Sequence, residues 1–448
     1  MDAELNILAL SSDQIGSINQ VPTKEDSEGL SEAEQDLKSL KDDAPNDDLP
    51  VGPLIKKCCT MDQGKSANRI IIVAAVWLLL LFTYSGATPI LTIQSPDGDS
   101  IDCLDRMDQP SLQNPLLKNH VIQETPSHMV KTEEGFGWQV WHSGGTACPR
   151  GTIPVRRFET NVSHSKNNPD AADRATRGHQ YAIAQMQNQS FYGTKATLNV
   201  WSPVVESPDD FSLAQIWLVS GHYQTNDINT VEAGWQVFPN RYHDRQSRLF
   251  TYWTRDAYVR TGCYSTHCVG FVHVSSTIAL EAAIAPTSTF GGDQFDITLQ
   301  IWKDGSIFGE LVVGYGREYR ADWILVFTTL SDHATTIQWG GEVLYRNTSG
   351  MNTTTQMGSG RFPDEGFRKA AYFCNIQIAQ ENRTFLPLQD FNFTMGDTQR
   401  DSYTIKKAHN QACGTHFYYG GPGPLRSASD RVSFTFLLFS FSFFVFVV

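Results

Sequence analysis

The sequence lacks an excess of basic residues. Its 448 residues carry 35 Lys and Arg against 48 Asp and Glu, a formal net charge of −13. Domains that bind nucleic acid are usually basic, so this balance argues against a nucleic-acid partner. Cysteine is also scarce. Eight cysteines in a chain of this length are too few for a disulfide scaffold, although they allow a few local bridges in an oxidising compartment.

The signatures of several enzyme classes are absent. There is no Gly-x-Ser-x-Gly, no His-Glu-x-x-His, no Gly-rich phosphate loop, and no Asp-Thr-Gly or Asp-Ser-Gly triplet. We therefore expect no cofactor. Cys263 and Cys268 flank His267, but a zinc site needs four ligands. We expect no metal there, and a short disulfide-closed loop between the two cysteines instead.

Long hydrophobic runs are also few. The run Ile70–Phe82 follows basic residues and precedes small residues ending at Ala87. It is shorter than the roughly 20 residues of a membrane span, and the arrangement is typical of a secretory signal. The uncharged stretch continues to Ser95, so a signal anchor is the alternative. Residues 1–69 are acidic and poor in aromatics, which predicts disorder, and a start at Met61 would make the residues before it a gene-model extension or an alternative isoform.

Six glycosylation sequons all follow this apolar run. They lie at Asn161, Asn188, Asn347, Asn352, Asn382 and Asn392. Their position on one side of the run predicts a lumenal, glycosylated and secreted protein. The alternative is a single-pass membrane protein with a lumenal catalytic domain. We expect membrane contact only if the apolar stretch 70–90 or the C-terminal tail is retained.

The body of the chain predicts an all-β fold. Short alternating runs separated by Gly and Asp turns indicate an antiparallel β-sandwich. The clearest runs are Ala196–Trp201, Leu213–Val219, Phe295–Trp302 and Ile324–Thr328. The chain then divides into an extension (1–69), a signal peptide or anchor (70–87), a small pro-segment with a possible helix at Pro110–Asn119 (88–160), the sandwich (175–424) and an apolar tail (425–448).

Two of the predicted strands carry the candidate chemistry. In Val231–Val237 the residues Glu232, Gly234 and Gln236 share one face, and in Ile337–Val343 the residues Gln338, Gly340 and Glu342 do so. The two polar faces are mirror images.

Antiparallel pairing of these strands, with Gly234 opposite Gly340, would place Glu232 opposite Glu342 at about 5 Å between Cβ atoms. A separating strand or a groove would also let them converge. Two close carboxylates do not both ionise easily, which supplies a general base and a general acid at acidic pH. The alternatives are two solvent-facing glutamates on unrelated strands, or the carboxylate pair of a glycosidase.

The chain resembles the neprosin family of secreted plant glutamic peptidases. The matching catalytic-domain motifs are Gly178–Ala182, Asn229–Val237, Arg248–Thr254, Thr261–Tyr264, Gln338–Val343, Gln356–Gly360 and Phe417–Gly423. Those of the activation peptide are Ile101–Cys103, Gln109–Pro110, Pro115–His120 and Gly151–Arg157.

This resemblance implies a zymogen with an activation peptide and an acid endopeptidase that cleaves peptide or protein substrates after proline. It places the catalytic glutamates on Glu232 and Glu342. Substrate-binding or orienting roles would fall to Gln236, Gln338, Gly234, Gly340 and Trp235. The family usually has a cysteine before Tyr-x-Ile and another near its C-terminus, whereas this chain has Ser402 and an apolar tail.

A non-catalytic β-sandwich that binds cell-wall glycan or protein is the alternative function. Trp201, Trp217, Trp235 and Trp253 are the aromatic side chains that could stack on sugars, although Trp in such sheets more often belongs to the core. The presence of both glutamates favours the peptidase.

We expect N-terminal sequencing of the mature protein to find nothing upstream of Ala87, because small residues after a short apolar run are the cleavage signal of a secretory leader. Purified glycosylated protein that retains an intact segment Asp2–Lys57 would instead support the membrane anchor.

Overall fold

The structure is a computed structural model. It describes residues 88–114, 139–142, 146–158, 178–303, 311–315, 321–323, 327–345, 353–382, 384–389, 394–397 and 402–423. The acidic extension, the apolar run and the C-terminal tail lie outside these residues, as do sequons Asn161, Asn347, Asn352 and Asn392. Within the described residues, no helix is long and apolar enough to cross a membrane.

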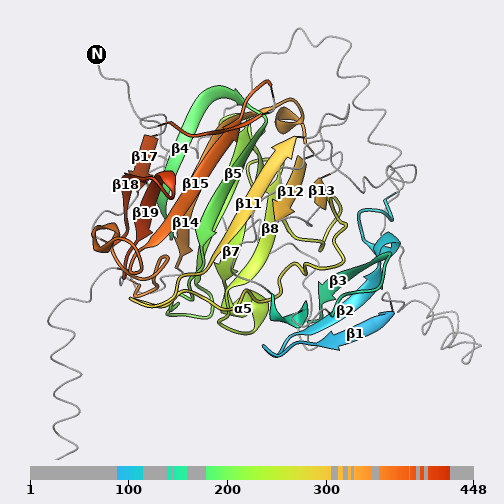
Figure 1. Cartoon of the computed structure of the whole chain (residues 1–448). Coiled ribbons are helices and arrows are strands. Elements are labelled where there is room, and N and C mark those ends of the chain that lie inside the picture. The colour runs from blue at the N-terminus through green and yellow to red at the C-terminus, as the bar shows by residue number, and fades with distance from the viewer. Residues whose placement is uncertain are drawn as a thin grey trace, which may run out of the picture. The chain divides into compact units, whose positions relative to one another are not determined.

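Two antiparallel sheets form the body of the protein (Figure 1). The seven-stranded sheet has the spatial order β17 (Thr394–Asp397), β4 (His179–Phe191), β14 (Ala334–Leu344), β6 (Phe211–Ser220), β7 (Asn229–Val237), β8 (Arg248–Thr254) and β9 (Cys263–Tyr264). The other has the order β10 (Phe271–His273), β13 (Ala321–Trp323), β12 (Leu311–Tyr315), β11 (Asp296–Lys303), β5 (Gly193–Asn199), β15 (Ala371–Ala379), β19 (Gly414–Gly420) and β18 (Thr404–Asn410), with β16 (Phe385–Pro387) paired to β15.

A third, small sheet comes from the predicted pro-segment. It consists of β1 (Leu91–Gln94), β2 (Ser100–Asp105) and β3 (Thr152–Arg156). The described helices are short: α5 (Pro239–Tyr242) and the 3-10 turns η2 (Arg106–Asp108), η4 (Val140–His142), η5 (Thr329–Ser331) and η6 (Pro363–Glu365). The all-β prediction is therefore confirmed.

One detail of the predicted elements differs from the structure. Residues 110–114 form turns and a bend rather than the start of a helix, and residues 115–119 lie outside the described residues. Of the strand expected at Ile324–Thr328, residues 324–326 also lie outside the described residues, and residues 327–328 are not in a strand.

Alternation along the strands decides which side chains enter the core. On β7, Val231, Ala233 and Trp235 are completely buried among residues of both large sheets. On β14, Trp339 does the same, and Gly341 lets the sheets approach: a Cβ there would lie 2.6 Å from Tyr419 of β19. The polar residues of both strands therefore point to the opposite face of the seven-stranded sheet.

The pro-segment docks through side-chain amides. Gln109 donates from Nε2 to the carbonyl of His273 at 2.8 Å and accepts from its backbone N–H at 2.7 Å. Gln139 makes the same pair of contacts with Ala279. A disulfide joins Cys103 of β2 to Cys148, which lies just before β3. Each amide therefore satisfies one backbone donor and one acceptor, as a paired strand would.

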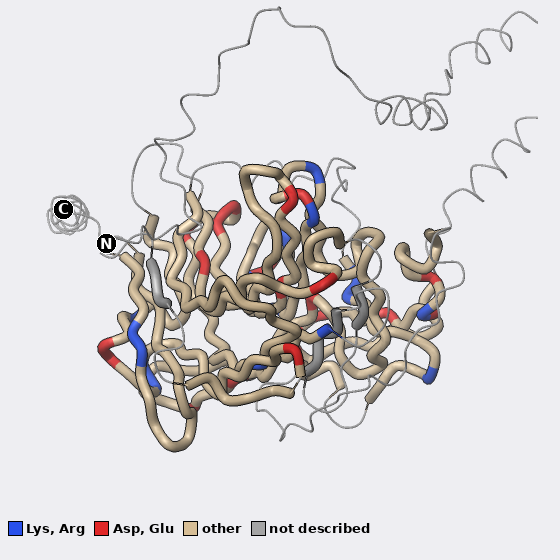
Figure 2. Tube along the Cα trace, turned by 90° about the horizontal axis from the view of Figure 1, so that it is seen from above, with Lys and Arg blue, Asp and Glu red and all other residues tan. Residues whose placement is uncertain are grey.

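Charged positions are scattered along the described trace, with long uncharged stretches between them (Figure 2). Arg248 of β8 is one of several buried charged residues, and its side chain is completely buried. It donates twice to Asp99 of the pro-segment, at 2.9 Å each, and also pairs with Asp244. Arg156 of β3 donates to the same Asp99 at 2.8 Å. Burial raises the pKa of Asp99, but the hydrogen bonds and charges of Arg248 and Arg156 outweigh it and hold the pKa below its usual value.

We expect Asp99→Asn to lower the unfolding free energy of the precursor by about 3–5 kcal/mol at neutral pH, because it leaves a buried guanidinium short of its partner. The contribution of Asp99 is present above its ordinary pKa of 3.8 and is lost as the pH falls through the lowered native value. Urea titrations at neutral pH and at decreasing pH below about 4 measure this, and the difference from wild type should shrink as the pH falls.

Asp102→Asn is the matched control, since Asp102 pairs with Arg157, whose side chain is 47% exposed. It should cost no more than about 1 kcal/mol. Equal losses for the two variants would contradict a special role for Asp99.

Candidate active site

Glu232 and Glu342 lie on the face of the seven-stranded sheet that points away from the core. Residues paired across neighbouring strands on this face form rows that run across the sheet. One row contains Tyr181, Glu342, Leu213, Gln236 and Arg248, on β4, β14, β6, β7 and β8. The next contains Ile183, Gly340, Gln215, Gly234 and Phe250, and the third contains Gln185, Gln338, Trp217, Glu232 and Tyr252. Glu232 and Glu342 therefore share one face.

The direct pairing of the two glutamate strands is wrong. β6 lies between β7 and β14 and is antiparallel to both, so β7 and β14 run parallel. Gly234 and Gly340 do share a row, but Glu232 shares its row with Gln338 rather than with Glu342. Standard sheet spacings put the two glutamates roughly 10 Å apart across the strands and roughly 13 Å apart along them. The separating strand is the arrangement that the structure adopts.

Glu232 is completely buried and held by donors from three elements. Gln215 of β6 donates from Nε2 to Oε2 at 2.9 Å. Thr230 of β7 and Tyr258, in the loop after β8, each donate from a hydroxyl to Oε1 at 2.8 Å. Three donors on one carboxyl group fix the orientation of both of its oxygens.

The loop that carries Tyr258 is strained. Ala257 and Tyr258 both have positive φ angles, 54° and 64°, which side chains other than glycine adopt at a cost. Asp256 holds the loop by accepting from the backbone N–H groups of Arg260 and Thr261. The result of this conformation is that the Tyr258 hydroxyl reaches Glu232.

Glu342 has a different partner. It is 1% exposed, and its Oε1 lies 2.5 Å from Nδ1 of His179, the first residue of β4. An imidazole and a carboxyl group in contact can hold a proton between them. Glu232 therefore sits among neutral donors, whereas Glu342 sits beside an imidazole.

The two glutamines expected as orienting groups are held by other side chains. Gln236 donates from Nε2 to the Tyr264 hydroxyl at 3.2 Å and accepts from the Tyr242 hydroxyl at 3.0 Å. Gln338 donates from Nε2 to Gln185 at 2.9 Å. Both lie on the face of the glutamates, each in the row of the glutamate from the other strand.

Trp235 was expected among the substrate-binding residues and is not on this face. Its side chain is completely buried in the core between the sheets, where Nε1 donates to the carbonyl of Asn199 at 3.0 Å. Side chains alternate between the two faces of β7, and Trp235 is an odd number of residues from Glu232, so the two side chains lie on different faces of the sheet. The four tryptophans considered as sugar platforms are 0–6% exposed, so none offers an open ring face: Trp201, Trp217, Trp235 and Trp253.

Gly234 and Gly340 are required by the close packing of neighbouring strands, and not only by an open substrate groove. A Cβ on Gly234 would lie 2.0 Å from the carbonyl oxygen of Ala214, and one on Gly340 would lie 2.2 Å from that of Ala182. Both distances are below any real Cβ contact. Close approach of the neighbouring strands therefore requires glycine at both positions, whether or not a substrate also uses the space.

Sequence reasoning missed Gln215 and Tyr258, and it quoted His179 only as part of a motif. Gln215 lies within a run that the sequence predicts as a strand, but nothing in its own strand marks it. Tyr258 belongs to a loop, whose conformation the alternation of strands does not specify. Of the remaining predicted sites, Cys263 and Cys268 form a disulfide, and the sequon residues Asn188 and Asn382 are exposed. No group of His, Cys, Asp and Glu suited to a metal occurs among the described residues.

An all-β fold with two buried glutamates on one face, together with matches to two family models, defines the class: a glutamic-type peptidase made with an activation peptide. The chain belongs to the neprosin family. The family model described as neprosin matches residues 208–422, and the model described as neprosin activation peptide matches residues 92–185.

Solved structures with partial similarity include scytalido-glutamic peptidase with a peptide-based transition state analog. It is 12% identical with a TM-score of 0.27, covering 55% of this chain and 98% of that one. SCP-B, a member of the Eqolisin family in complex with the tripeptide Ala-Ile-His, is 11% identical with a TM-score of 0.26, covering 54% and 96%. Likeness at this level adds nothing to the assignment of the site.

Two curated relatives match over a short segment. RNA cytidine acetyltransferases 2 and 1 of Arabidopsis thaliana are each 76% identical over 66 residues. That is 15% of this chain and 6% of each relative, so the chain spans only a small fraction of their length.

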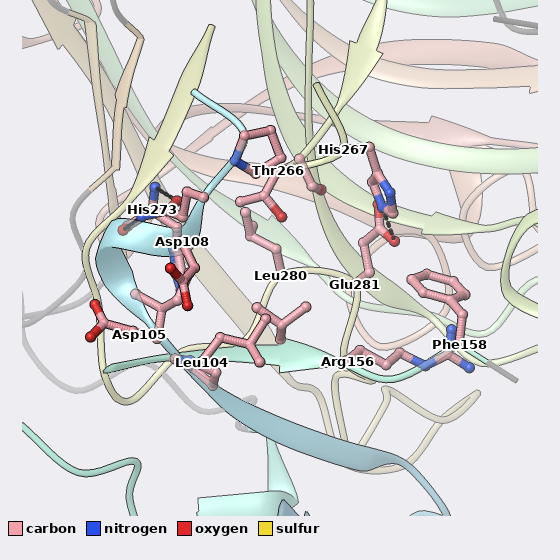
Figure 3. A pocket seen from close by; sticks show the side chains of 16 residues that line it. Leu104, Asp105, Asp108, Arg156, Phe158, Thr266, His267, His273, Leu280 and Glu281 are labelled. Atoms are coloured by element: carbon pink, nitrogen blue, oxygen red, sulfur yellow. Dashed lines mark hydrogen bonds and ion pairs between the residues drawn. The ribbon is translucent and has the colours of Figure 1, made fainter. Parts of the chain in front are cut away.

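A cavity of about 280 Å³ lies between the pro-segment and the sandwich, away from the glutamates (Figure 3). Figure 3 shows His267 beside Glu281, whose Oε2 lies 3.0 Å from Nε2 of His267. Burial lowers the pKa of His273 to about 4 from 6.5. The other charged groups around the cavity are Asp105, Asp108, Arg156, His267 and Glu281.

The lowered pKa of His273 makes the docked pro-segment sensitive to acid. A proton binds His273 more tightly when the ring is exposed, so docking loses stability as the pH falls from about 6.5 towards 4. The full difference corresponds to about 3 kcal/mol. We expect His273→Asn to shift release of the pro-segment to lower pH. Hydrogen exchange of residues 100–111 across a pH series, in protein carrying Glu232→Gln to prevent self-cleavage, measures the midpoint.

His409→Asn is the control for this measurement, because His409 is exposed on β18, at the opposite edge of the sheet from β10. It should leave the midpoint unchanged. The same midpoint for His273→Asn and wild type would contradict the role of His273.

Proposed function

We propose that this protein is a secreted acid endopeptidase in which Glu232 and Glu342 act on one water molecule to hydrolyse peptide bonds after proline. The observation that carries the proposal is the presence of two buried glutamates on one face of the seven-stranded sheet, on either side of a row that contains Gly340 and Gly234. A peptide backbone lying over this row would pass between them.

In this mechanism the water oxygen attacks the scissile carbonyl carbon, and one glutamate takes the proton that the water loses. The other glutamate donates a proton to the amide nitrogen as the C–N bond breaks. The products are a carboxylic acid and an amine. The two glutamates then exchange their protons with solvent and return to their starting states.

Post-proline specificity is supported by family membership and by the surroundings of Glu232. Trp217 and Tyr252 are its neighbours across β6 and β8, and both belong to an apolar cluster on this face of the sheet. Both side chains are buried and offer no open ring face, but they make the surroundings of Glu232 apolar, which suits the apolar ring of proline. A series of peptides that differ only in the residue before the scissile bond tests this preference.

Secretion is supported by the family and by features of an oxidising, glycosylating compartment. Three disulfides join Cys103 to Cys148, Cys263 to Cys268 and Cys374 to Cys413. The two described sequon residues are exposed. Removal of N-linked glycans from protein collected outside expressing plant cells, detected as a decrease in mass, tests this part of the proposal.

We expect Glu232→Gln and Glu342→Gln each to reduce cleavage of a Pro-containing peptide by about 10³-fold or more, because each removes one proton-transfer group from the same reaction. The double variant should be little worse than either single variant. The wild-type rate should also fall as the pH rises, because the acid is lost once both carboxyl groups ionise. Peptide-cleavage rates with matched circular dichroism measure these effects.

Glu365→Gln provides the matched control, since Glu365 is exposed in η6 and should leave the rate unchanged. A folded Glu342→Gln enzyme with a near-normal rate would remove Glu342 from the mechanism. The non-catalytic binding function would then be the better explanation.

A further inference from the structure

Gln215 lies midway between the two glutamates. It shares a row with Gly340 on β14 and Gly234 on β7. Glu342 lies one strand and one row away in one direction, and Glu232 lies one strand and one row away in the other. Diagonal neighbours of this kind are about 7–8 Å apart, within reach of long side chains. No other residue of β6 has this relation to both glutamates.

The contacts of Gln215 use only half of its amide group. The side chain is completely buried, and its Nε2 donates to Oε2 of Glu232 at 2.9 Å. Its Oε1 is also buried and has no hydrogen-bond partner among the described residues. A buried acceptor without a donor costs about 1–3 kcal/mol, and in native proteins such a group calls for a functional explanation.

The neighbouring glycine makes room for this side chain. A Cβ on Gly234 would lie 2.6 Å from the Cβ of Gln215, so any larger residue at position 234 would displace Gln215. Glycine at position 234 is therefore required by the position of the Gln215 side chain as well as by the close approach of β6 and β7.

We propose that Gln215 is the third functional residue of this centre: its Nε2–H positions the Glu232 carboxyl group, and its Oε1 accepts a hydrogen bond from the attacking water. The inference rests on the proposed function. Gln215 neither gains nor loses a proton, so the two glutamates retain the proton transfers. A water held by Gln215 lies between them, which explains how two residues so far apart in the register act on one molecule.

The test compares Gln215→Leu and Gln215→Glu with wild type on a Pro-containing peptide across acidic pH. For Gln215→Leu we expect kcat to fall about 10²-fold or more, as when a preorganised hydrogen-bonding group is lost from an active site, with KM changed by less than about threefold. Because Gln215 Nε2 donates directly to the Glu232 carboxyl group, its loss should also move the limb of the pH–rate profile that reports Glu232. Movement of the acidic limb would identify Glu232 as the base, and movement of the alkaline limb would identify it as the acid.

Gln215→Glu gives a second, independent signature. When protonated, the new carboxyl group can donate to Glu232 from the same position, whereas its ionised form repels Glu232. The activity of this variant should therefore recover as the pH is lowered, below the optimum of wild type. A purely structural role for Gln215 would not produce this recovery.

Gln300→Leu is the control for the cost of removing a buried glutamine. Gln300 is 5% exposed and lies on β11 in the other sheet, so this variant should keep wild-type kcat and an unmoved profile. A folded Gln215→Leu or Gln215→Glu enzyme with kcat within threefold of wild type and both limbs unmoved would overturn the inference. If Gln215→Leu does not fold, Gln215→Glu alone decides, and absence of recovery at low pH counts against it.

The same assay separates this inference from the proposed function. Glu232→Gln and Glu342→Gln are measured beside the Gln215 variants. Retained activity in the glutamate variants would remove the proposed function itself. If the glutamate variants are inactive but the Gln215 variants cleave the peptide at the wild-type rate, only the proposed role of Gln215 is removed.

Discussion

The insertion of β6 between β7 and β14 is the constraint on which the site depends. Because β6 is antiparallel to both neighbours, the two glutamate strands become parallel, and their mirror-image polar faces become offset along the sheet. The offset separates Glu232 from Glu342 and gives each its own surroundings. It also brings a third strand into the centre, and with it Gln215. A two-stranded arrangement would have produced a contact dyad with no such intermediary.

Sequence reasoning found the faces of these strands because side-chain period is a local property. Val231, Ala233 and Trp235 alternate with polar residues, and the core takes the apolar set. The order of strands across a sheet is not local, because any strand with the correct face can be a neighbour. That is why the glutamates were recognised while their separation was not. The role expected for Trp235 failed for a related reason, since alternation places it on the opposite face from Glu232.

The pro-segment shows the same difference between what is local in the sequence and what depends on distant contacts. Its motifs mark its presence, but its attachment depends on partners far away in the sequence. Asp99 acts through Arg248, a residue of β8 whose motif gave no sign of burial. His273 acquires its lowered pKa only because the folded chain excludes water from its ring. The Asp99–Arg248 pair and the lowered pKa of His273 both depend on the exclusion of water by distant segments, and a sequence pattern does not show which segments pack together.

The docking of Gln109 at β10 has a consequence for the protein after the pro-segment leaves. β10 is an outer strand of its sheet, and the Gln109 amide occupies the backbone N–H and carbonyl of His273. Ser111 likewise donates to the carbonyl of Phe271 at 2.6 Å. Departure of the pro-segment uncovers this edge, the kind of surface through which chains self-associate. At three residues, β10 is too short to support an extended ladder with another molecule, so the activated protein can shed its cover without becoming prone to polymerise.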